Sequence, residues 1–304
     1  MEPVSHIEAL SRRFGIAGVA QIVAGKGGLP VVRIATAAAT AEVSLYGAQV
    51  ISWRPAGAEE VIFMSQRSHW KPGLAIRGGI PVCFPWFREK PGNPQAPKHG
   101  FVRTREWRLD SLRAEDDGSV TLVCLIASDE STRALWPHDF LLAYRIRIAN
   151  TLRLELSVMN RGPNPLRFEE ALHTYFRIGP IRDVRVRGLD AAAILDNNDS
   201  NRERRQEGEL ALTGPTDSAF IDTEAPVEIV DPALHRRLRT EKLHSRNTVV
   251  WNPWEDGAAK LSDLAPDEWQ RMLCVEAANI LGAAVSLAPG EEHTLRATIS
   301  VFPE

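Results

Sequence analysis

Residues 141–158 read LLAYRIRIANTLRLELSV, and this stretch indicates the fold class more clearly than any other. Apolar and polar side chains alternate along Leu142–Ile148 and again along Leu152–Val158. A period of two is typical of strands that bury one face and expose the other. Asn150 and Thr151 separate the two runs, so the sequence predicts an antiparallel hairpin of two long strands.

Other short runs along the chain have the character of strands. Residues Val120–Ala127 are apolar on both faces, which predicts a central strand of a stacked sheet. Further strands are predicted at residues 31–35, 41–46, 49–53, 61–64, 184–187, 248–251, 273–276 and 295–301.

Helical signals are confined to two places. Ile7, Leu10 and Phe14 fall at helical spacing near the N-terminus, and residues 266–272 begin with a proline that suits a first turn. Strands and helices do not alternate, and 21 glycines and 20 prolines interrupt the short strands. We therefore expect an all-β antiparallel sandwich or larger double sheet. No linker divides the chain, so residues 1–304 are expected to form one domain, with a helical extension over the first 20.

The overall composition narrows the class of protein. The 304 residues include 36 basic and 39 acidic side chains, a net charge of -3, which gives no case for binding nucleic acid or a membrane. The N-terminus lacks the basic-then-apolar pattern of a signal peptide. Cys83, Cys124 and Cys274 show no metal-type spacing, and we expect buried thiols in a cytoplasmic protein.

Residues 77–103, RGGIPVCFPWFREKPGNPQAPKHGFVR, bring together several residue types that suit a ligand. Glycines let the backbone approach it, and aromatic rings suit the apolar faces of a sugar. Arg77 and Arg103 suit a phosphate, and Lys98 and His99 stand close by in the sequence. We expect a small anionic ligand here, although bracing a loop is the commoner role of an arginine.

Two further residues are candidates for proton transfer. His173 follows a strand in ALHTYFRIGPI, and Glu276 ends an apolar strand in MLCVEAANI. An imidazole and a strand-held carboxylate are the minimum for acid and base catalysis near neutral pH. The structural alternatives are a hydrogen-bonded core histidine and a carboxylate paired with an arginine. The sequence contains no HExxH, no His-x-His pair and no clustered cysteines, so it predicts neither metal nor cofactor.

Two other features concern the surface and the aromatic residues. Residues 196–209, DNNDSNRERRQEGE, are expected to form a solvated loop. Trp53 and Trp251 are expected in the core, whereas Trp86 and Trp254 lie beside prolines, so one of these two is a candidate to flank a sugar.

Several motifs in a fixed order carry a family resemblance. The segments GAQVISWRPAGAEEVIFMS, AIRGGIPVCFPWF, KHGFVR, LHTYFRIGPI, VVWNPW and MLCVEAANI span roughly residues 40 to 300. Together they resemble the D-hexose-6-phosphate mutarotases, or glucose-6-phosphate 1-epimerases, a branch of the aldose 1-epimerase superfamily. The resemblance implies a galactose-mutarotase-like antiparallel β-supersandwich with few short helices. It also implies a monomeric isomerase that interconverts the α and β anomers of a hexose 6-phosphate without a metal or nucleotide.

The resemblance assigns roles to the candidate residues. It implies that His173 is the general acid and Glu276 the general base. It also implies that Arg77 and Arg103 bind the substrate, with the phosphate as their target.

The remaining assignments are less direct. Lys98 stands where relatives often carry glutamine, and His99 is expected in the cleft. Asp217 in GPTDSAF matches an aspartate that contacts sugar in relatives. Relatives commonly continue that motif with arginine, an apolar residue and tyrosine, whereas this chain has Ser218, Ala219 and Phe220.

Three other functions fit parts of this pattern. A neutral-sugar aldose 1-epimerase would use the same proton transfers without binding a phosphate. A carbohydrate-binding or regulatory β-sandwich would need arginines and aromatic residues but not both His173 and Glu276. Glycoside hydrolysis usually needs two facing carboxylates, and only Glu276 is identified here.

Overall fold

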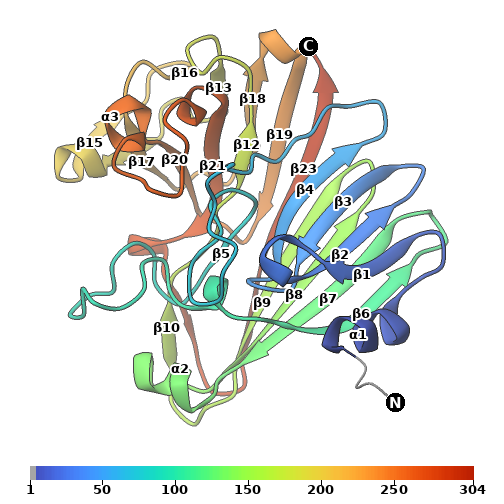
Figure 1. The fold of residues 1–304 in the computed structure, drawn as a ribbon. Coiled ribbons are helices and arrows are strands. Elements are labelled where there is room, and N and C mark those ends of the chain that lie inside the picture. The colour runs from blue at the N-terminus through green and yellow to red at the C-terminus, as the bar shows by residue number, and fades with distance from the viewer. Residues whose placement is uncertain (1–4) are drawn as a thin grey trace.

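A nine-stranded antiparallel sheet is the largest element of the protein (Figure 1). The computed structural model describes residues 5–304. The strand order in this sheet is β16-β13-β18-β19-β23-β9-β8-β7-β6. The strands are β6 (Arg108–Ala114), β7 (Val120–Ala127), β8 (Phe140–Ile148), β9 (Leu152–Asn160), β13 (Arg185–Arg187), β16 (Leu210–Ala211), β18 (Val227–Asp231), β19 (Arg236–Leu243) and β23 (Glu292–Pro303).

The predicted hairpin is confirmed inside this sheet. β8 and β9 pair from Phe140 opposite Asn160 to Ile148 opposite Leu152, so residues 149–151 make a tight turn between the strands. β7 is hydrogen-bonded on both sides, to β6 and β8, as expected of an inner strand. It lies second from the edge rather than at the centre of the sheet, because β6 ends the row.

An eight-stranded sheet carries the candidate site residues Asp217 and Glu276. Its order is β15-β14-β17-β20-β21-β11-β5, and β12 also pairs with β21. The strands are β5 (Val82–Cys83), β11 (Glu170–Leu172), β12 (Tyr175–Arg177), β14 (Ala193–Asp196), β15 (Arg202–Arg205), β17 (Thr216–Ile221), β20 (Asn247–Asn252) and β21 (Met272–Asn279). Every residue of β21 is buried, and strands flank it on both sides.

A four-stranded sheet lies in front of β7–β9 in Figure 1. It consists of β1 (Ala20–Ala24), β2 (Pro30–Ala35), β3 (Ala39–Ser44) and β4 (Gln49–Pro55), and a separate pair is formed by β10 (Leu166–Phe168) and β22 (Val285–Leu287). The indole of Trp53 on β4 donates a hydrogen bond to Ala149 O in the β8–β9 turn (3.1 Å). One cluster of buried apolar side chains includes residues of all three larger sheets, so the sheets share a core.

Helices are few and short. They are α1 (His6–Phe14), α2 (Glu130–Leu135), α3 (Trp254–Ala258) and the 3₁₀ turns η1 (Lys26–Gly28), η2 (Val102–Thr104), η3 (Asn197–Asp199), η4 (Pro232–Leu234), η5 (Glu268–Arg271) and η6 (Leu281–Ala283). The predicted N-terminal helix is confirmed as α1, which Ser5 and Glu8 cap reciprocally. Its Ile7, Leu10 and Phe14 pack against the core. Within residues 5–304, none of the helices is long and apolar enough to cross a membrane.

Two predicted elements differ from the structure. Residues 61–64 do not form a strand, because their backbone partners change from residue to residue: Val61 N bonds to Trp53 O, and Phe63 N bonds to Tyr175 O. The predicted helix at residues 266–272 is reduced to the single turn η5.

The turn ends at Arg271, because the chain enters β21 at Met272. The buried carboxylate of Glu268 accepts hydrogen bonds from Ser65 Oγ (2.6 Å) and Gln66 N (2.8 Å), which ties the turn to the loop at residue 65.

Residues 77–103, here named the covering segment, fold over the β5 edge of the eight-stranded sheet. Phe101 N donates to Phe84 O (3.1 Å), and His173 N donates to Pro81 O (3.0 Å), so the segment is bonded both to itself and to the sheet. Gly100 makes this crossing possible. Its φ is +74°, and a Cβ there would lie 1.8 Å from Phe84 O.

We expect Gly100→Ala to lower the free energy of unfolding by about 3 kcal/mol, because it combines a strained φ with a backbone clash. Gly92→Ala is the matched control: its φ is +75°, but no atom lies within 4 Å of its Cβ position. The control should cost about 1 kcal/mol. Urea unfolding of both variants measures the difference, and equal losses would show that the close approach at residue 100 is not what stabilises the segment.

Candidate active site

The register of three strands places polar side chains on one face of the eight-stranded sheet. Asp217 on β17 lies opposite Trp251 on β20, and Val249 on β20 lies opposite Glu276 on β21. Residues directly opposite in a pair share a face, as do residues two apart along a strand. All four side chains therefore project from the same side.

His173 reaches this face from the short connection between β11 and β12. Its ring stacks on Tyr175, with centroids 4.8 Å apart and planes 14° from parallel. Tyr175 lies opposite Cys274 on β21, two residues before Glu276. This places His173 Nε2 3.3 Å from Glu276 Oε1, although the two atoms make no hydrogen bond.

The covering segment closes a cavity of about 220 Å³ above this face. All seven residues singled out in the sequence line it: Arg77, Lys98, His99, Arg103, His173, Asp217 and Glu276. The structure therefore brings together residues that are up to 199 positions apart in the chain.

The carboxyl group of Glu276 and the imidazole of His173 are both deeply buried. Neither Glu276 oxygen, nor Nδ1 of His173, has a hydrogen-bond partner within residues 5–304. Burial, with Asp217 second, raises the pKa of Glu276 well above its usual value. Burial, followed by the positive charges of Arg103 and Arg77, lowers the pKa of His173 to about 3. Without a ligand, both shifts favour an uncharged pair, with a protonated carboxyl and a neutral imidazole.

The two arginines predicted to bind phosphate differ in their partners. Arg77 forms an ion pair with Asp263 (3.1 Å) and donates a hydrogen bond to Tyr175 Oη (3.0 Å). Arg103 donates only to the backbone oxygen of Lys98 (3.0 Å), and its Nε is buried without a partner. In the described part of the chain, no carboxylate pairs with Arg103. Unlike Arg77, it therefore lines the cavity without a carboxylate to balance its charge.

A third arginine, which the sequence did not single out, fixes Asp217. Arg88 Nη2 lies 2.6 Å from Asp217 Oδ1, and Asn197 Nδ2 donates to Asp217 Oδ2 (2.7 Å). Arg88 Nη1 also donates to Asn197 Oδ1 (2.9 Å), which closes a ring of three side chains. Asp217 therefore has a fixed orientation and a balanced charge.

Asn197 comes from the stretch that was predicted to be a solvated loop. Residues 202–205 of that stretch are exposed, but they form β15 at the edge of the sheet, so the prediction of a loop was wrong there. The preceding turn η3 carries Asn197 to the cavity side. No local signal distinguishes this asparagine from its polar neighbours, because its role depends on the sheet edge that carries it.

Lys98 and His99 occupy different depths. The side chain of Lys98 is 67% exposed and forms an ion pair with Glu89 (2.6 Å), so it lies at the mouth of the cavity. His99 is enclosed, with its ring edge-on to Phe87 at 4.7 Å between centroids. Burial is the main cause of a pKa well below the usual value for His99, so its ring is uncharged at neutral pH.

The aromatic residues of the cavity are not the predicted ones. Phe87 and Trp251 line it, because the pleat of β20 turns Trp251 toward the site. Trp86 instead packs edge-on against Phe101 in the core (5.6 Å), and Trp254 packs against Trp269 (4.7 Å). The expectation that Trp86 or Trp254 flanks the ligand was wrong. Trp251 packs against the core, as predicted, but it also faces the cavity.

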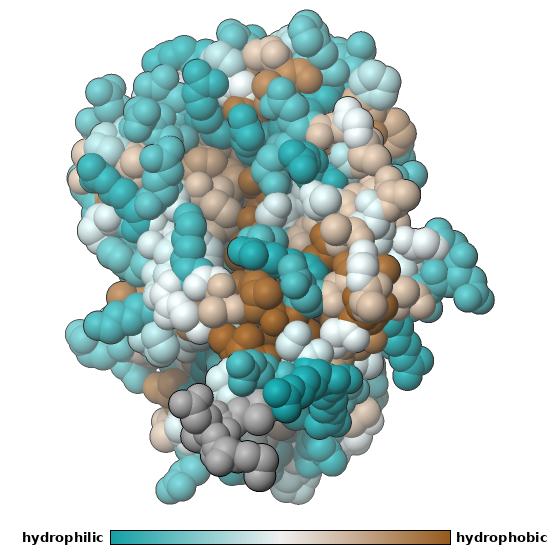
Figure 2. Space-filling model, turned by 45° about the vertical axis from the view of Figure 1, so that its right-hand side comes forward, coloured by the Kyte–Doolittle hydropathy of each residue, from teal (hydrophilic) through white to brown (hydrophobic). Residues whose placement is uncertain are grey.

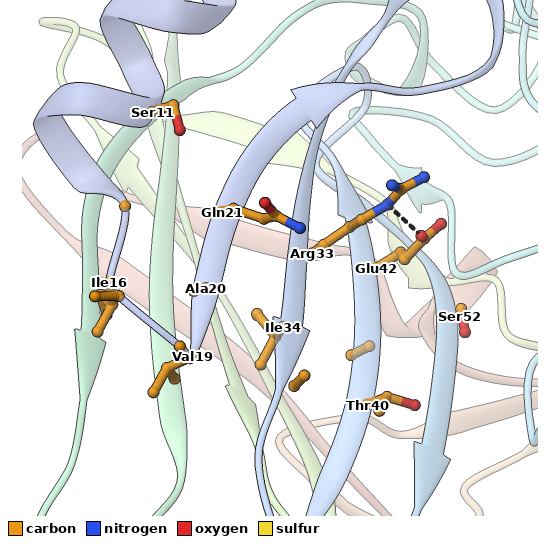
Figure 3. Close-up of a pocket in the computed structure, with 15 residues that line it drawn as sticks. Ser11, Ile16, Val19, Ala20, Gln21, Arg33, Ile34, Thr40, Glu42 and Ser52 are labelled. Atoms are coloured by element: carbon orange, nitrogen blue, oxygen red, sulfur yellow. Dashed lines mark hydrogen bonds and ion pairs between the residues drawn. The ribbon is translucent and has the colours of Figure 1, made fainter.

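Two larger cavities contain none of the candidate catalytic or binding residues. A groove of about 670 Å³ lies between α1 and the sheet β1–β4, and Arg33 and Glu42 on its wall pair with each other at 2.8 Å (Figure 3). Figure 2 shows hydrophobic residues gathered in a hollow near the centre of the face that it draws. A second cavity of about 580 Å³ lies beside His244 and His293. None of the seven candidate residues lines either one.

Comparisons with known proteins agree with this site and fold. The family model described as aldose 1-epimerase matches residues 30–300. A protein of Escherichia coli K12 named "Putative glucose-6-phosphate 1-epimerase" is 36% identical over 78% of this chain and 79% of its own length. A protein of the same name from Cenchrus ciliaris is 33% identical over 86% of this chain and 82% of its own.

Solved structures extend the comparison to the fold. The crystal structure of a "putative mutarotase" from Salmonella typhimurium has a TM-score of 0.89 at 30% identity, covering 96% of each chain. A galactose mutarotase-like protein from Clostridium acetobutylicum has a TM-score of 0.71 at 14% identity, over 94% of this chain and 98% of its own, which shows a common fold. The expected galactose-mutarotase-like sandwich is confirmed. Since the family model and its relatives cover most of its length, the chain belongs to the aldose 1-epimerase family and is an isomerase.

Proposed function

We propose that this enzyme interconverts the α and β anomers of a hexose 6-phosphate, with glucose 6-phosphate as the first candidate. The observation that carries this proposal is the guanidinium group of Arg103, which lacks a carboxylate partner beside a buried acid–base pair. A cavity for a neutral sugar has no need of an uncompensated charge, because burying one is costly. The names of the 36% and 33% identical relatives support the same substrate.

Arg103 and Arg77 would anchor the phosphate through charge-assisted hydrogen bonds. Lys98 at the mouth would add positive charge on the entry path. Asp217, held by Arg88 and Asn197, still has lone pairs with which to accept a hydrogen bond from a ring hydroxyl.

The chemical step requires one base and one acid close together. As a carboxylate, Glu276 removes the proton of the anomeric hydroxyl, while His173, as an imidazolium, donates a proton to the ring oxygen. Both oxygens are bonded to the same carbon, so their partners must be neighbours, as Nε2 and Oε1 are at 3.3 Å. The bond between that carbon and the ring oxygen breaks and an aldehyde forms. Rotation of the aldehyde and the reverse proton transfers close the ring as the other anomer.

We also propose an oligomeric state and a cellular location for this enzyme. Every side chain in this mechanism comes from one chain, so a monomer is sufficient for the reaction. Cys83, Cys124 and Cys274 are buried and free, which fits a reducing compartment. We therefore place the reaction in the cytoplasm.

We expect Glu276→Gln and His173→Asn each to lower the turnover number about 10²–10⁴-fold, because each removes one positioned proton transfer. Anomer exchange of glucose 6-phosphate, followed by two-dimensional exchange NMR, measures the loss. Glu292→Gln and His235→Asn are the matched controls, because both residues are exposed and lie outside the cavity. Turnover close to the parent value in either site variant would remove that residue from the mechanism.

We expect Arg103→Ala to lower the preference for glucose 6-phosphate over glucose, measured as the ratio of kcat/KM values, by about 10- to 100-fold. The reason is the loss of a charged donor that only the phosphorylated sugar uses. Arg33→Ala is the control, because Arg33 pairs with Glu42 in the distant groove. Equal losses on both sugars would contradict a phosphate-binding role.

A further inference from the structure

The charged groups around the acid–base pair fall into two sets. Arg77 acts on the His173 end: its guanidinium donates to Tyr175 Oη, and the Tyr175 ring stacks on His173. Asp217 and Arg88 act on the Glu276 end, since Asp217 shares the sheet face of Glu276 and is bonded to Arg88. The cavity is therefore polarised along the line that joins the imidazole to the carboxyl.

Positive and negative charges balance at the Glu276 end, whereas the His173 end has a surplus of positive charge. The Asp217 carboxylate offsets the Arg88 charge through a 2.6 Å contact. At the other end, Asp263 offsets Arg77. Arg103, whose charge acts on His173 and also on Glu276, has no acidic partner in residues 5–304. A surplus positive charge beside a buried imidazole opposes its protonation, since like charges interact strongly where water is excluded.

The other titratable groups that face the pair add no charge. His99 lines the cavity from the covering segment, Tyr175 lies on β12, and Cys274 lies on β21 on the same face as Glu276. Burial lowers the pKa of His99 and raises the pKa values of the Tyr175 phenol and the Cys274 thiol. All three are uncharged near neutral pH. The field across the pair therefore comes from the arginines and Asp217, together with Asp263 beside Arg77 and the Lys98–Glu89 ion pair at the mouth of the cavity.

We propose that the phosphate of the bound sugar moves the proton of the pair from Glu276 to His173. One proton leaves the carboxyl group of Glu276 and binds His173 Nε2, 3.3 Å away, so no proton enters or leaves the site. The dianion cancels the charges of Arg103 and Arg77 at the imidazole end, which favours positive charge there. The neutral pair of the free enzyme thereby becomes the carboxylate base and imidazolium acid that ring opening needs. This inference rests on the proposed function, because it takes the phosphate to lie at these two arginines.

The phosphate then affects the rate as well as the binding of the substrate. An anchor that serves only for binding lowers KM and leaves kcat unchanged. A group that creates the reactive protonation state raises kcat. We therefore expect saturating glucose 6-phosphate to turn over at least about tenfold faster than saturating glucose, since each unit of pKa is a tenfold change in the protonated fraction.

The decisive measurement reads the proton directly, in the absence of turnover. The two probes are 1,5-anhydroglucitol and 1,5-anhydroglucitol 6-phosphate, which lack the anomeric hydroxyl and cannot react. Imidazole ¹⁵N shifts of histidine-labelled protein distinguish neutral from protonated rings, and the His173→Asn variant identifies the His173 signals among those of eight histidines.

We expect His173 to remain neutral at pH 7 in the free enzyme and with 1,5-anhydroglucitol, and to become protonated with the 6-phosphate. The midpoint of its titration should rise from about 3 to above 7, a shift of at least about four pH units, which is a change of about 10⁴ in the ratio of protonated to neutral ring. A neutral His173 in both complexes would overturn the proposal. So would the failure of the 6-phosphate to perturb any signal, since no anion would then occupy the site.

Two variants separate an electrostatic from a structural role for Arg103. Arg103→Ala should raise the titration midpoint of His173 in the free enzyme, because it removes the opposing charge. Arg33→Ala should leave that midpoint unchanged. An unchanged midpoint in Arg103→Ala would count against the proposal.

Failure of this inference and failure of the proposed function give different results. If anomer exchange shows no preference for phosphorylated over free sugar, the proposed substrate is wrong whatever the NMR shows. If the preference is present but His173 stays neutral with the bound 6-phosphate, only the relocation of the proton is wrong.

Discussion

The burial of the Glu276 carboxyl group is the constraint on which the site depends. The side chain is 1% exposed, on a strand that is buried at every position, and neither oxygen has a hydrogen-bond partner within residues 5–304. A carboxyl group in such surroundings cannot be charged by solvent alone. The neighbouring charges, and those that a ligand brings, therefore determine whether it acts as a base.

The fold supplies those charges from two sources. The sheet contributes Asp217 and Glu276 in a fixed register, and the covering segment contributes Arg88 and Arg103 from the opposite side. Within residues 5–304, Arg88 pairs with Asp217, whereas no carboxylate pairs with Arg103. In the mechanism that we propose, the acid–base pair stays neutral until an anion binds, which couples recognition of a phosphate to chemistry at the other end of a sugar.

The fold class could be predicted because strand periodicity is a local property. The hairpin of β8 and β9 follows from alternating side chains and two turn residues, with no reference to the rest of the chain. Predictions failed where distant partners decided the structure. Residues 61–64 have strand-like side chains, but their backbone bonds to several unconnected segments. The helix predicted before β21 is a single turn, because strand pairing begins at Met272.

The sequence by itself determined the residue types of the site and the motifs that contain them, because ligands of a given chemistry need particular side chains. It could place Arg77, Arg103, His173 and Glu276 in motifs, and these residues do line one cavity. Only the tertiary structure decided that Arg88 and Asn197 hold Asp217, and that Trp251 rather than Trp86 faces the cavity. It also decided that no carboxylate within residues 5–304 pairs with Arg103, and that burial shifts the pKa values of His173 and Glu276 toward an uncharged pair. Pairing and burial depend on which distant strands become neighbours, and no local pattern of residues records that information.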